Sequence, residues 1–250
     1  MLIRLLNFLR WVLRLRDHKI VDGSIVPCAF QRRCGTEFKG DHYFVRSAET
    51  EARRLVDHFK CTQSSNVLDV GCAYGRLPIG LIRVLKKSNY LGLDVDANAI
   101  DWCKRNIKSK ETSFDFQFIN VKNERYNSAG SEMDHNFKFA LPDNHFDIIY
   151  LYSVFSHMLE PDIRSYLKEF SRILRSSGNV FFTTFVEENV PKVSSNPENY
   201  VFTKCSGPLH VVRYEKNYLF ALLEDEGFKV QNFTHRTETD GQSALYLKKL

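Results

Sequence analysis

The stretch from Val67 to Leu81, VLDVGCAYGRLPIGL, constrains the fold of this chain most strongly. Its opening apolar run is typical of a strand buried in a parallel sheet. The run breaks at Gly71, and apolar residues return at helical spacing from Arg76 to Leu85. The stretch therefore predicts a strand, a glycine turn and a helix. Such a turn lets the backbone approach a ligand closely and aims the free N–H groups of the first helical turn at it.

The spacing of the glycines separates two classes of cofactor. The dinucleotide fingerprint has glycines at its first, third and sixth positions, whereas Gly71 is followed by Ala73 and Arg76 at the third and sixth. Nicotinamide and flavin are therefore disfavoured. The stretch instead resembles motif I of the class I S-adenosylmethionine-dependent methyltransferases. That motif is an acidic residue followed by GxGxG, carried here by Asp69, Gly71, Ala73 and Gly75.

The resemblance implies S-adenosyl-L-methionine as the cofactor. Around the glycine turn it implies six cofactor-binding residues: Asp69, Gly71, Cys72, Ala73, Gly75 and Arg76. Ala73 departs from the family pattern, because an alanine cannot adopt positive φ without cost. Either this residue has negative φ, or the cofactor loop is slightly reshaped.

A second buried strand is predicted from Tyr90 to Val95, with Asp94 near its end. A carboxylate there can accept hydrogen bonds from both ribose hydroxyls of an adenosyl group, and in the methyltransferases this position binds the ribose. Asp96 could share that role, or it could cap the helix predicted from Ala99 to Ile107. We assign the ribose to Asp94, with Val95 beside it, and the cap to Asp96.

Alternating aromatic residues predict a third strand from Phe114 to Phe118. In the family an Asp shortly after this strand commonly accepts from the adenine amino group. Asn120 stands there instead, and its amide oxygen can still accept, so the resemblance implies Asn120 and Val121 as adenine neighbours. The polar segment 122–139 is predicted to be an insertion, long enough to form a loop over the site.

The fourth strand is predicted from Phe146 to Leu151, and the residues that follow lie at the edge where open α/β sheets bind ligands. This region resembles that of small-molecule methyltransferases, several of which carry a His at the position of His157. Ser153 is assigned to the cofactor. The sequence does not match the (Asn/Asp)-Pro-Pro-(Tyr/Phe) motif of enzymes that methylate planar base amines, so nucleobase methylation is disfavoured.

The remaining pattern completes an α/β fold. A helix begins near Pro161, a fifth strand spans Val180 to Val186, and residues 187–209 are irregular. Two further strands, from Phe228 to Thr234 and from Ala244 to Leu250, fit the closing pair of the family. We predict a Rossmann-like, doubly wound sheet of seven strands, mostly parallel with an antiparallel last strand. The methyltransferase domain is placed at 64–250, with insertions at 122–139 and 187–209.

The N-terminal part is predicted to be separate from this domain. Residues 1–16 form a basic amphipathic helix that could lie in a membrane interface, or dock on its own domain or on a second subunit. Residues 17–63 are a lead-in segment that either caps the site or merely connects, and its last part, from Arg46 to Phe59, has helical spacing.

Composition limits the partners. Of the net charge of +5, Arg4, Arg10, Arg14 and Arg16 supply four charges, so the body is nearly neutral and a nucleic-acid partner is disfavoured. No apolar run reaches the roughly 20 residues of a spanning helix. The six cysteines include no CxxC pair, so no metal site is predicted. Reduced thiols are favoured, as in a cytoplasmic protein, and peripheral membrane contact is left open. The oligomeric state is left open too.

Methyl transfer to a hydroxyl oxygen is aided by a general base, and His157 is the first candidate. Its alternative is a structural His that binds a backbone carbonyl. Tyr152, Glu187 and His210 are secondary candidates, whereas His145 falls on the wrong side of the sheet. The predicted function is methyl transfer to a small-molecule or lipid- or glycan-linked acceptor, with a hydroxyl favoured. The alternatives are a protein or amine N-methyltransferase and a non-catalytic cofactor-binding subunit that activates a partner.

Overall fold

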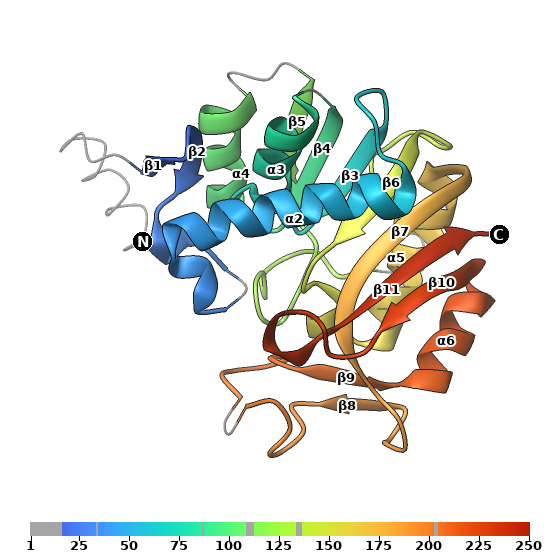
Figure 1. Ribbon diagram of the computed structural model, residues 1–250. Helices are drawn as coiled ribbons and strands as arrows, with labels where there is room; N and C mark the ends of the chain where they lie inside the picture. Colours follow the sequence, from blue (N-terminus) through green and yellow to red (C-terminus); the bar gives the residue numbers. More distant parts are fainter. Residues whose placement is uncertain (1–16, 34, 87, 109–112, 134–136, 203–204) are drawn as a thin grey trace.

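The computed structural model of the protein describes residues 17–33, 35–86, 88–108, 113–133, 137–202 and 205–250 (Figure 1). The amphipathic helix predicted for residues 1–16 lies outside these residues. Within the described part, none of the helices combines the length and apolar character needed to cross a bilayer.

Seven strands in the order β10-β11-β7-β6-β3-β4-β5 form the main path of a nine-stranded sheet at the centre of the fold (Figure 1). These seven strands are β3 (Asn66–Val70), β4 (Asn89–Asp94), β5 (Phe114–Phe118), β6 (Phe146–Leu151), β7 (Leu174–Glu187), β10 (Phe228–Thr234) and β11 (Ser243–Lys249). All neighbours from β5 to β7 are parallel, whereas β11 runs antiparallel to both β7 and β10. The predicted Rossmann-like sheet with an antiparallel last strand is confirmed.

Helices cover both faces of this sheet. One core cluster joins a face of the sheet to α2 (Asp41–Phe59), α3 (Arg76–Leu85) and α4 (Ala97–Cys103). The other joins the opposite face to α5 (Glu160–Ile173) and α6 (Lys216–Asp225). Successive strand residues point to opposite faces. Val67 accordingly lies in the first cluster and Leu68 in the second.

Short elements complete the chain. They are β1 (His18–Val21), β2 (Ser24–Pro27), β8 (Val193–Ser195), β9 (Val212–Glu215), the 3₁₀ turns η1 (Ala29–Gln31), η2 (Glu37–Lys39), η4 (Phe155–His157) and η5 (Thr239–Gly241), and the π-helical turn η3 (Lys104–Lys108). None of the four short strands was predicted from the sequence, and for β8 and β9 the reason is the same. β9 forms by pairing with the end of β7, and β8 forms by pairing with β9, so neither depends on local pattern alone.

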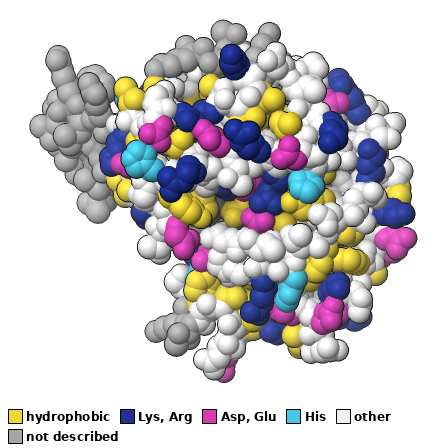
Figure 2. All heavy atoms as spheres, viewed as in Figure 1, with side chains coloured by type: hydrophobic (Ala, Val, Ile, Leu, Met, Phe, Trp, Pro, Cys, Tyr) yellow, Lys and Arg dark blue, Asp and Glu magenta, His cyan; other side chains and the backbone are white. Residues whose placement is uncertain are grey.

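The lead-in segment is fixed to α2 by a buried arginine. The side chain of Arg32 donates to the carbonyl oxygens of Pro27 and Lys39 at 2.9 and 3.0 Å, and to Asp41 Oδ1 at 2.7 Å. Because Asp41 begins α2, these bonds hold the segment across the end of that helix. On the face seen in Figure 2, Lys and Arg side chains are interspersed with Asp and Glu.

Close packing of α2 on α3 gives a test of the fold. A Cβ atom at Gly80 would lie 1.9 Å from the carbonyl oxygen of Ala48. We expect Gly80→Ala to lower the free energy of unfolding by about 2 kcal/mol or more, because overpacking outweighs the better helix propensity of alanine. Urea denaturation measures this.

Gly227→Ala is the matched control. Its Cβ would meet nothing within 4 Å, although φ is +85°, so only the backbone cost of about 1–2 kcal/mol applies. A Gly80→Ala protein as stable as the wild type would show that the two helices are not in contact at Ala48.

Candidate cofactor and active site

A cavity of about 370 Å³ opens at the carboxyl ends of the parallel strands. This volume is within the range of small-molecule sites, and the position is the one at which open α/β sheets bind ligands. The segments after β3, β4, β5 and β6 line it, together with parts of both predicted insertions and of the lead-in segment. The cavity therefore gathers regions far apart in the sequence.

The glycine turn forms the wall of the cavity next to β3. A Cβ at Gly71, where φ is +83°, would lie 2.5 Å from Val154 Cγ2, so the close approach requires glycine. Ala73 also has positive φ, at +45°. The sequence analysis left two alternatives, a negative φ at Ala73 or a slightly reshaped cofactor loop, and the first of these is wrong. Its N–H donates to Asp94 Oδ2 at 2.7 Å, which offsets part of the backbone cost.

Asp94 lines the cavity at the end of β4, and only 9% of it is exposed. Its Oδ2 accepts from the N–H of Ala73, and its Oδ1 accepts from the N–H of Asp96 at 2.8 Å. Burial raises the pKa of Asp94, and these two hydrogen bonds oppose the rise. Because each carboxylate oxygen has a second lone pair, Asp94 can also accept from two hydroxyls of a ligand.

Asp96 caps α4, as predicted. Its Oδ1 accepts from the backbone N–H groups of Asn98 and Ala99 at 3.0 and 3.4 Å. Its other carboxylate oxygen forms an ion pair with Arg33 at 2.6 Å. Arg33 belongs to the lead-in segment and lines the cavity, so this pair places that segment at the site.

The structure brings eight of the predicted site residues together. Those that line the cavity are Gly71, Ala73, Asp94, Val95, Val121, Tyr152, Ser153 and His157. The other six lie outside it: Asp69, Cys72, Gly75, Arg76, Asn120 and Glu187.

Several of these six residues lie beneath the glycine turn. Asp69 is buried and accepts from the hydroxyl of Tyr90 at 2.6 Å, and burial raises its pKa to about 7. Cys72 is buried against Gly92, and Gly75 is the N-cap of α3. These three residues shape the turn from below and do not reach the cavity.

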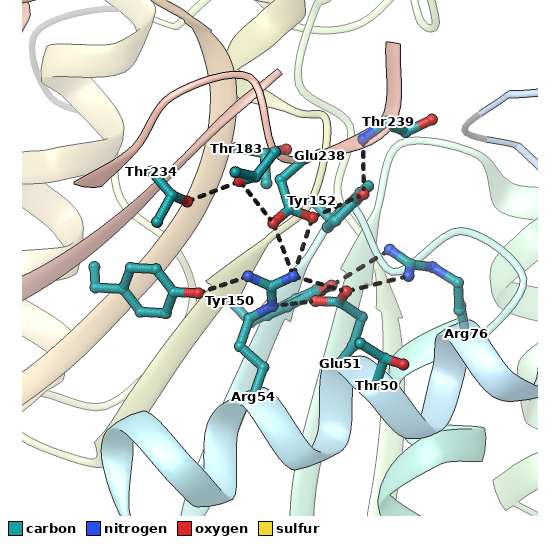
Figure 3. A network of polar contacts seen from close by, with 12 residues as sticks. Thr50, Glu51, Arg54, Arg76, Tyr150, Tyr152, Thr183, Thr234, Glu238 and Thr239 are labelled. Carbon is teal, nitrogen blue, oxygen red and sulfur yellow. Dashed lines mark hydrogen bonds and ion pairs between the residues drawn. The ribbon is translucent and has the colours of Figure 1, made fainter. Parts of the chain in front are cut away.

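Arg76 joins a buried charge cluster, which we define as Glu51, Arg54, Arg76 and Glu238 (Figure 3). Arg54 lies between the acids, with Nε 3.0 Å from Glu51 Oε2 and Nη2 2.9 Å from Glu238 Oε1. Arg76 Nη1 lies 3.8 Å from Glu51 Oε1. The two positive and two negative charges balance, as buried charges require.

The charge cluster holds Tyr152 at the cavity wall. The Tyr152 hydroxyl donates to Glu238 Oε2 at 3.2 Å, and the guanidinium of Arg76 lies 4.2 Å from the centre of the Tyr152 ring. The sequence analysis missed Glu51, Arg54 and Glu238. For Glu51 a signal existed, because it falls on the apolar face of α2 between Ala48 and Leu55.

The side chains of Asn120 and Glu187 form hydrogen bonds outside the cavity. The Asn120 amide contacts Asn127 Nδ2 at 3.2 Å and Ser131 Oγ at 3.4 Å, within the first insertion. Glu187, at the end of β7, accepts from the Arg236 guanidinium at 2.7 Å. Neither side chain reaches the cavity in this structure.

His157 is a buried, neutral imidazole at the cavity. Its Nδ1 lies 2.9 Å from the carbonyl oxygen of Leu209, which can only accept, so Nδ1 carries the proton and Nε2 keeps its lone pair. Burial is the main cause that lowers the pKa of His157 to about 4; the charge of Arg125 acts in the same direction, and the hydrogen bond to Leu209 opposes it. Nε2 has one weak neighbour, Ser153 Oγ at 3.4 Å.

Ser153 is held in an uncommon conformation, with φ of +59°. Its N–H donates to Thr183 Oγ1 at 2.8 Å, and its Oγ accepts from Gln242 Nε2 at 2.9 Å. Thr183 in turn donates to Gln242 Oε1 at 2.7 Å. Such strain concentrates at functional sites when the surroundings over-determine it.

Of the other histidines considered, His210 also lines the cavity, where it stacks on Phe202 with ring centres 4.6 Å apart. His145 precedes β6, at the opposite end of that strand from the cavity, as expected.

Arg125, from the first insertion, reaches the cavity without being predicted. It donates to the carbonyl oxygen of Ser206 at 2.6 Å, and in the described part of the chain it has no carboxylate partner. Nothing in the local pattern marks it, because its position depends on how the insertion folds back.

The sheet order, the glycine turn and the carboxylate at the end of β4 define a Rossmann-like protein that binds a nucleoside-bearing cofactor. Comparison with known proteins narrows this class. The family profile described as "Methyltransferase domain" matches residues 67–178. An uncharacterized methyltransferase of Schizosaccharomyces pombe is 25% identical over 135 residues, which are 54% of this chain and 44% of that protein.

A fatty-acid O-methyltransferase of Mycolicibacterium smegmatis is 29% identical over 123 residues, 48% of this chain and 37% of that protein. The crystal structure of a SAM-dependent methyltransferase from Aquifex aeolicus superposes with a TM-score of 0.54 at 19% identity, covering 82% of this chain and 93% of that one. The profile match shows that the chain contains a methyltransferase domain, and its fold is that of S-adenosylmethionine-dependent methyltransferases, whose cofactor is S-adenosyl-L-methionine. It spans less than half the length of these two curated relatives.

The buried carboxyl of Asp69 gives a pH prediction. Its folded-state pKa of about 7 is above the ordinary value of 3.8, so the protonated carboxyl contributes stability at low pH that is lost as the pH rises through about 7. Asn keeps the acceptor for Tyr90 and cannot ionise. We therefore expect Asp69→Asn to unfold at higher urea than the wild type at pH 8.

The measurement is the difference in free energy of unfolding between the two proteins at pH 5 and pH 8. A difference that does not change between these values would show that Asp69 titrates with an ordinary pKa.

Proposed function

We propose that this chain is a methyltransferase that transfers the methyl group of S-adenosyl-L-methionine to a small-molecule acceptor, with a hydroxyl oxygen as the favoured target. One observation carries the proposal. The cavity that contains the glycine turn and Asp94 also contains the neutral imidazole of His157. A cofactor site and a group able to take up a proton thus share one enclosed space.

The residues of the cofactor half fit the proposed ligand. Gly71 and Ala73 would hold its methionine part, Asp94 its ribose, and Val95, Val121 and Ser153 the neighbouring walls. When bound, S-adenosyl-L-methionine supplies a methyl group on a positively charged sulfur, which an oxygen nucleophile can attack. The protein must then hold the acceptor about 3 Å from that carbon and in line with it.

His157 would serve as the general base for a hydroxyl acceptor. Its Nε2 would take the hydroxyl proton while the hydrogen bond from Nδ1 to Leu209 keeps the ring in place. Tyr152, fixed by the charge cluster, would form the wall against which the acceptor rests. Glu187 keeps no part in this proposal, because Arg236 and Tyr200 occupy its carboxylate outside the cavity.

A carboxylate acceptor is the second candidate, and it is favoured by Arg125. This guanidinium lines the cavity without a carboxylate partner among the described residues, so it could bind one from a substrate. The name of the Mycolicibacterium relative, a fatty-acid O-methyltransferase, supports the same class. A carboxylate needs no general base, so the two candidates can be separated.

Three further proposals concern partners and location. A lipid- or glycan-linked acceptor would agree with peripheral membrane contact through residues 1–16, on a protein otherwise placed in the cytoplasm. A protein or amine acceptor would give N-methylation. A non-catalytic subunit would bind the cofactor and activate a partner without turnover.

Methyl transfer is tested directly with radiolabelled S-adenosyl-L-methionine and host-cell extract, separated into lipid, protein, nucleic-acid and small-molecule fractions. We expect label in the small-molecule or lipid fraction.

Asp94→Asn should lose roughly tenfold to a hundredfold of the affinity for S-adenosylhomocysteine, because a charge-assisted hydrogen bond to the ribose is lost, and should transfer correspondingly less label. Wild-type protein that binds the cofactor but labels no fraction would favour the non-catalytic subunit.

The role of His157 is tested by His157→Gln on the acceptor so identified. For a hydroxyl acceptor we expect turnover to fall about 10²- to 10⁴-fold with unchanged S-adenosylhomocysteine affinity, because only the base is lost. Wild-type turnover should be independent of pH above about 5, because a base with a pKa of about 4 is then fully deprotonated.

His145→Gln, at the far end of β6, is the control and should keep full turnover. For a carboxylate acceptor the pattern reverses: His157→Gln keeps most of its turnover and Arg125→Gln raises KM. Undiminished kinetics in both variants would remove both residues from the mechanism.

A further inference from the structure

Two polar groups in the cavity have no use in the proposed chemistry. Asp162, in the first turn of α5, and Tyr166, one turn later, both line the cavity. Only 4% of Tyr166 is exposed, yet within the described chain neither its hydroxyl nor the Asp162 carboxylate makes a hydrogen bond or ion pair. A buried hydroxyl is normally paired, so the Tyr166 hydroxyl, with the half-buried Asp162 carboxylate in the same cavity, points to a ligand.

Tyr166 is held rigidly in this position. Its ring packs against Phe137, Phe139, Phe155 and Phe170, with ring centres between 5.2 and 6.3 Å apart. The hydroxyl is therefore fixed before any ligand arrives. Asp94, Asp162 and Tyr166 all line the same cavity, and the charges of the two carboxylates add to burial in raising the pKa of Tyr166.

The walls next to these groups are apolar and suit a flat ring. Ile119 and Val121 follow β5, and Val154 and Met158 follow β6. Because β5 and β6 lie on opposite sides of β3 and β4 in the sheet, these apolar pairs border the cavity from two directions. Asp94 is at the end of β4, between them.

We propose that Asp162 and Tyr166 bind the amino edge of the cofactor's adenine, in place of Asn120. The carboxylate of Asp162 accepts a hydrogen bond from the exocyclic amino group, and the hydroxyl of Tyr166 donates to the adjacent ring nitrogen. Asn120 does not line the cavity, and its amide is bound to Asn127 and Ser131 within the first insertion. The inference rests on the proposed cofactor, and it adds the residues that distinguish adenine from other bases.

The test compares two ligands that differ only at this edge. S-adenosylhomocysteine carries the amino group, whereas S-inosylhomocysteine carries a carbonyl oxygen there and a proton on the adjacent nitrogen. If Asp162 is the acceptor, binding of the inosyl compound places its carbonyl oxygen against the Asp162 carboxylate, two acceptors that cannot bond to each other. These buried groups then stay unpaired. We expect the full-length wild-type protein to prefer S-adenosylhomocysteine by about 30-fold or more in calorimetric titration.

Asp162→Asn should reduce that preference at least tenfold, because its amide can donate to the inosyl oxygen. Tyr166→Phe removes only the hydroxyl, keeps the ring packing, and should reduce the preference by a smaller factor. Glu160→Gln is the control: this carboxylate lies in the same helical turn but is bound to Arg164 and Tyr218 outside the cavity, so the preference should not change. Asn120→Ala should also leave it unchanged.

The outcomes separate this inference from the proposed function. If the wild type binds S-adenosylhomocysteine and Asp162→Asn keeps the full preference, the inference is wrong and the methyltransferase proposal stands. If Asn120→Ala loses the preference for S-adenosylhomocysteine, Asn120 is the residue that binds the adenine amino group. A wild-type protein that binds neither ligand would overturn the inference and the proposed cofactor site together.

Discussion

The cavity depends on the two backbone hydrogen bonds that the Asp94 carboxylate accepts. One comes from Ala73 in the glycine turn after β3, and the other from Asp96 at the start of α4. The N–H groups of Gly71 and Cys72 add two bonds to the carbonyl oxygen of Leu93, at 2.8 and 3.0 Å. The turn is thereby tied to β4 without help from a ligand. A loop ordered in advance costs less entropy when a ligand binds.

The charge cluster performs a similar task on the other side of the glycine turn. Glu51 and Arg54 come from α2, Arg76 from α3, and Glu238 from the segment between β10 and β11. Removing any one of them would leave the buried cluster with an unbalanced charge, which is destabilising. Because the same cluster binds the hydroxyl of Tyr152, the stability of this packing and the shape of the cavity are linked.

Local patterns were sufficient to predict the parallel strands, the antiparallel closing strand and the cap at Asp96, because burial and capping act over a few residues. They were also sufficient to bring Asp94 and His157 to one edge of the sheet, since parallel strands end together. Local patterns do not show the orientation of Asn120, which contacts Asn127 and Ser131 in the folded insertion. They do not mark Arg125 either, whose contact with Ser206 joins segments 81 residues apart. Contacts of this kind have no local signature.

The charges of the cavity are arranged in two groups. Asp94 and Asp162 lie where an adenosyl group would be bound through its hydroxyls and amino group, which are donors. Arg125 acts on His157 and His210, and after burial its charge is the next cause that lowers the pKa of each. The arginine therefore helps to keep both imidazoles neutral at physiological pH, the form in which Nε2 of His157 can accept a proton. The same positive charge would stabilise an acceptor oxygen that becomes negative as its proton leaves, so one side chain favours both the base and the nucleophile that it produces.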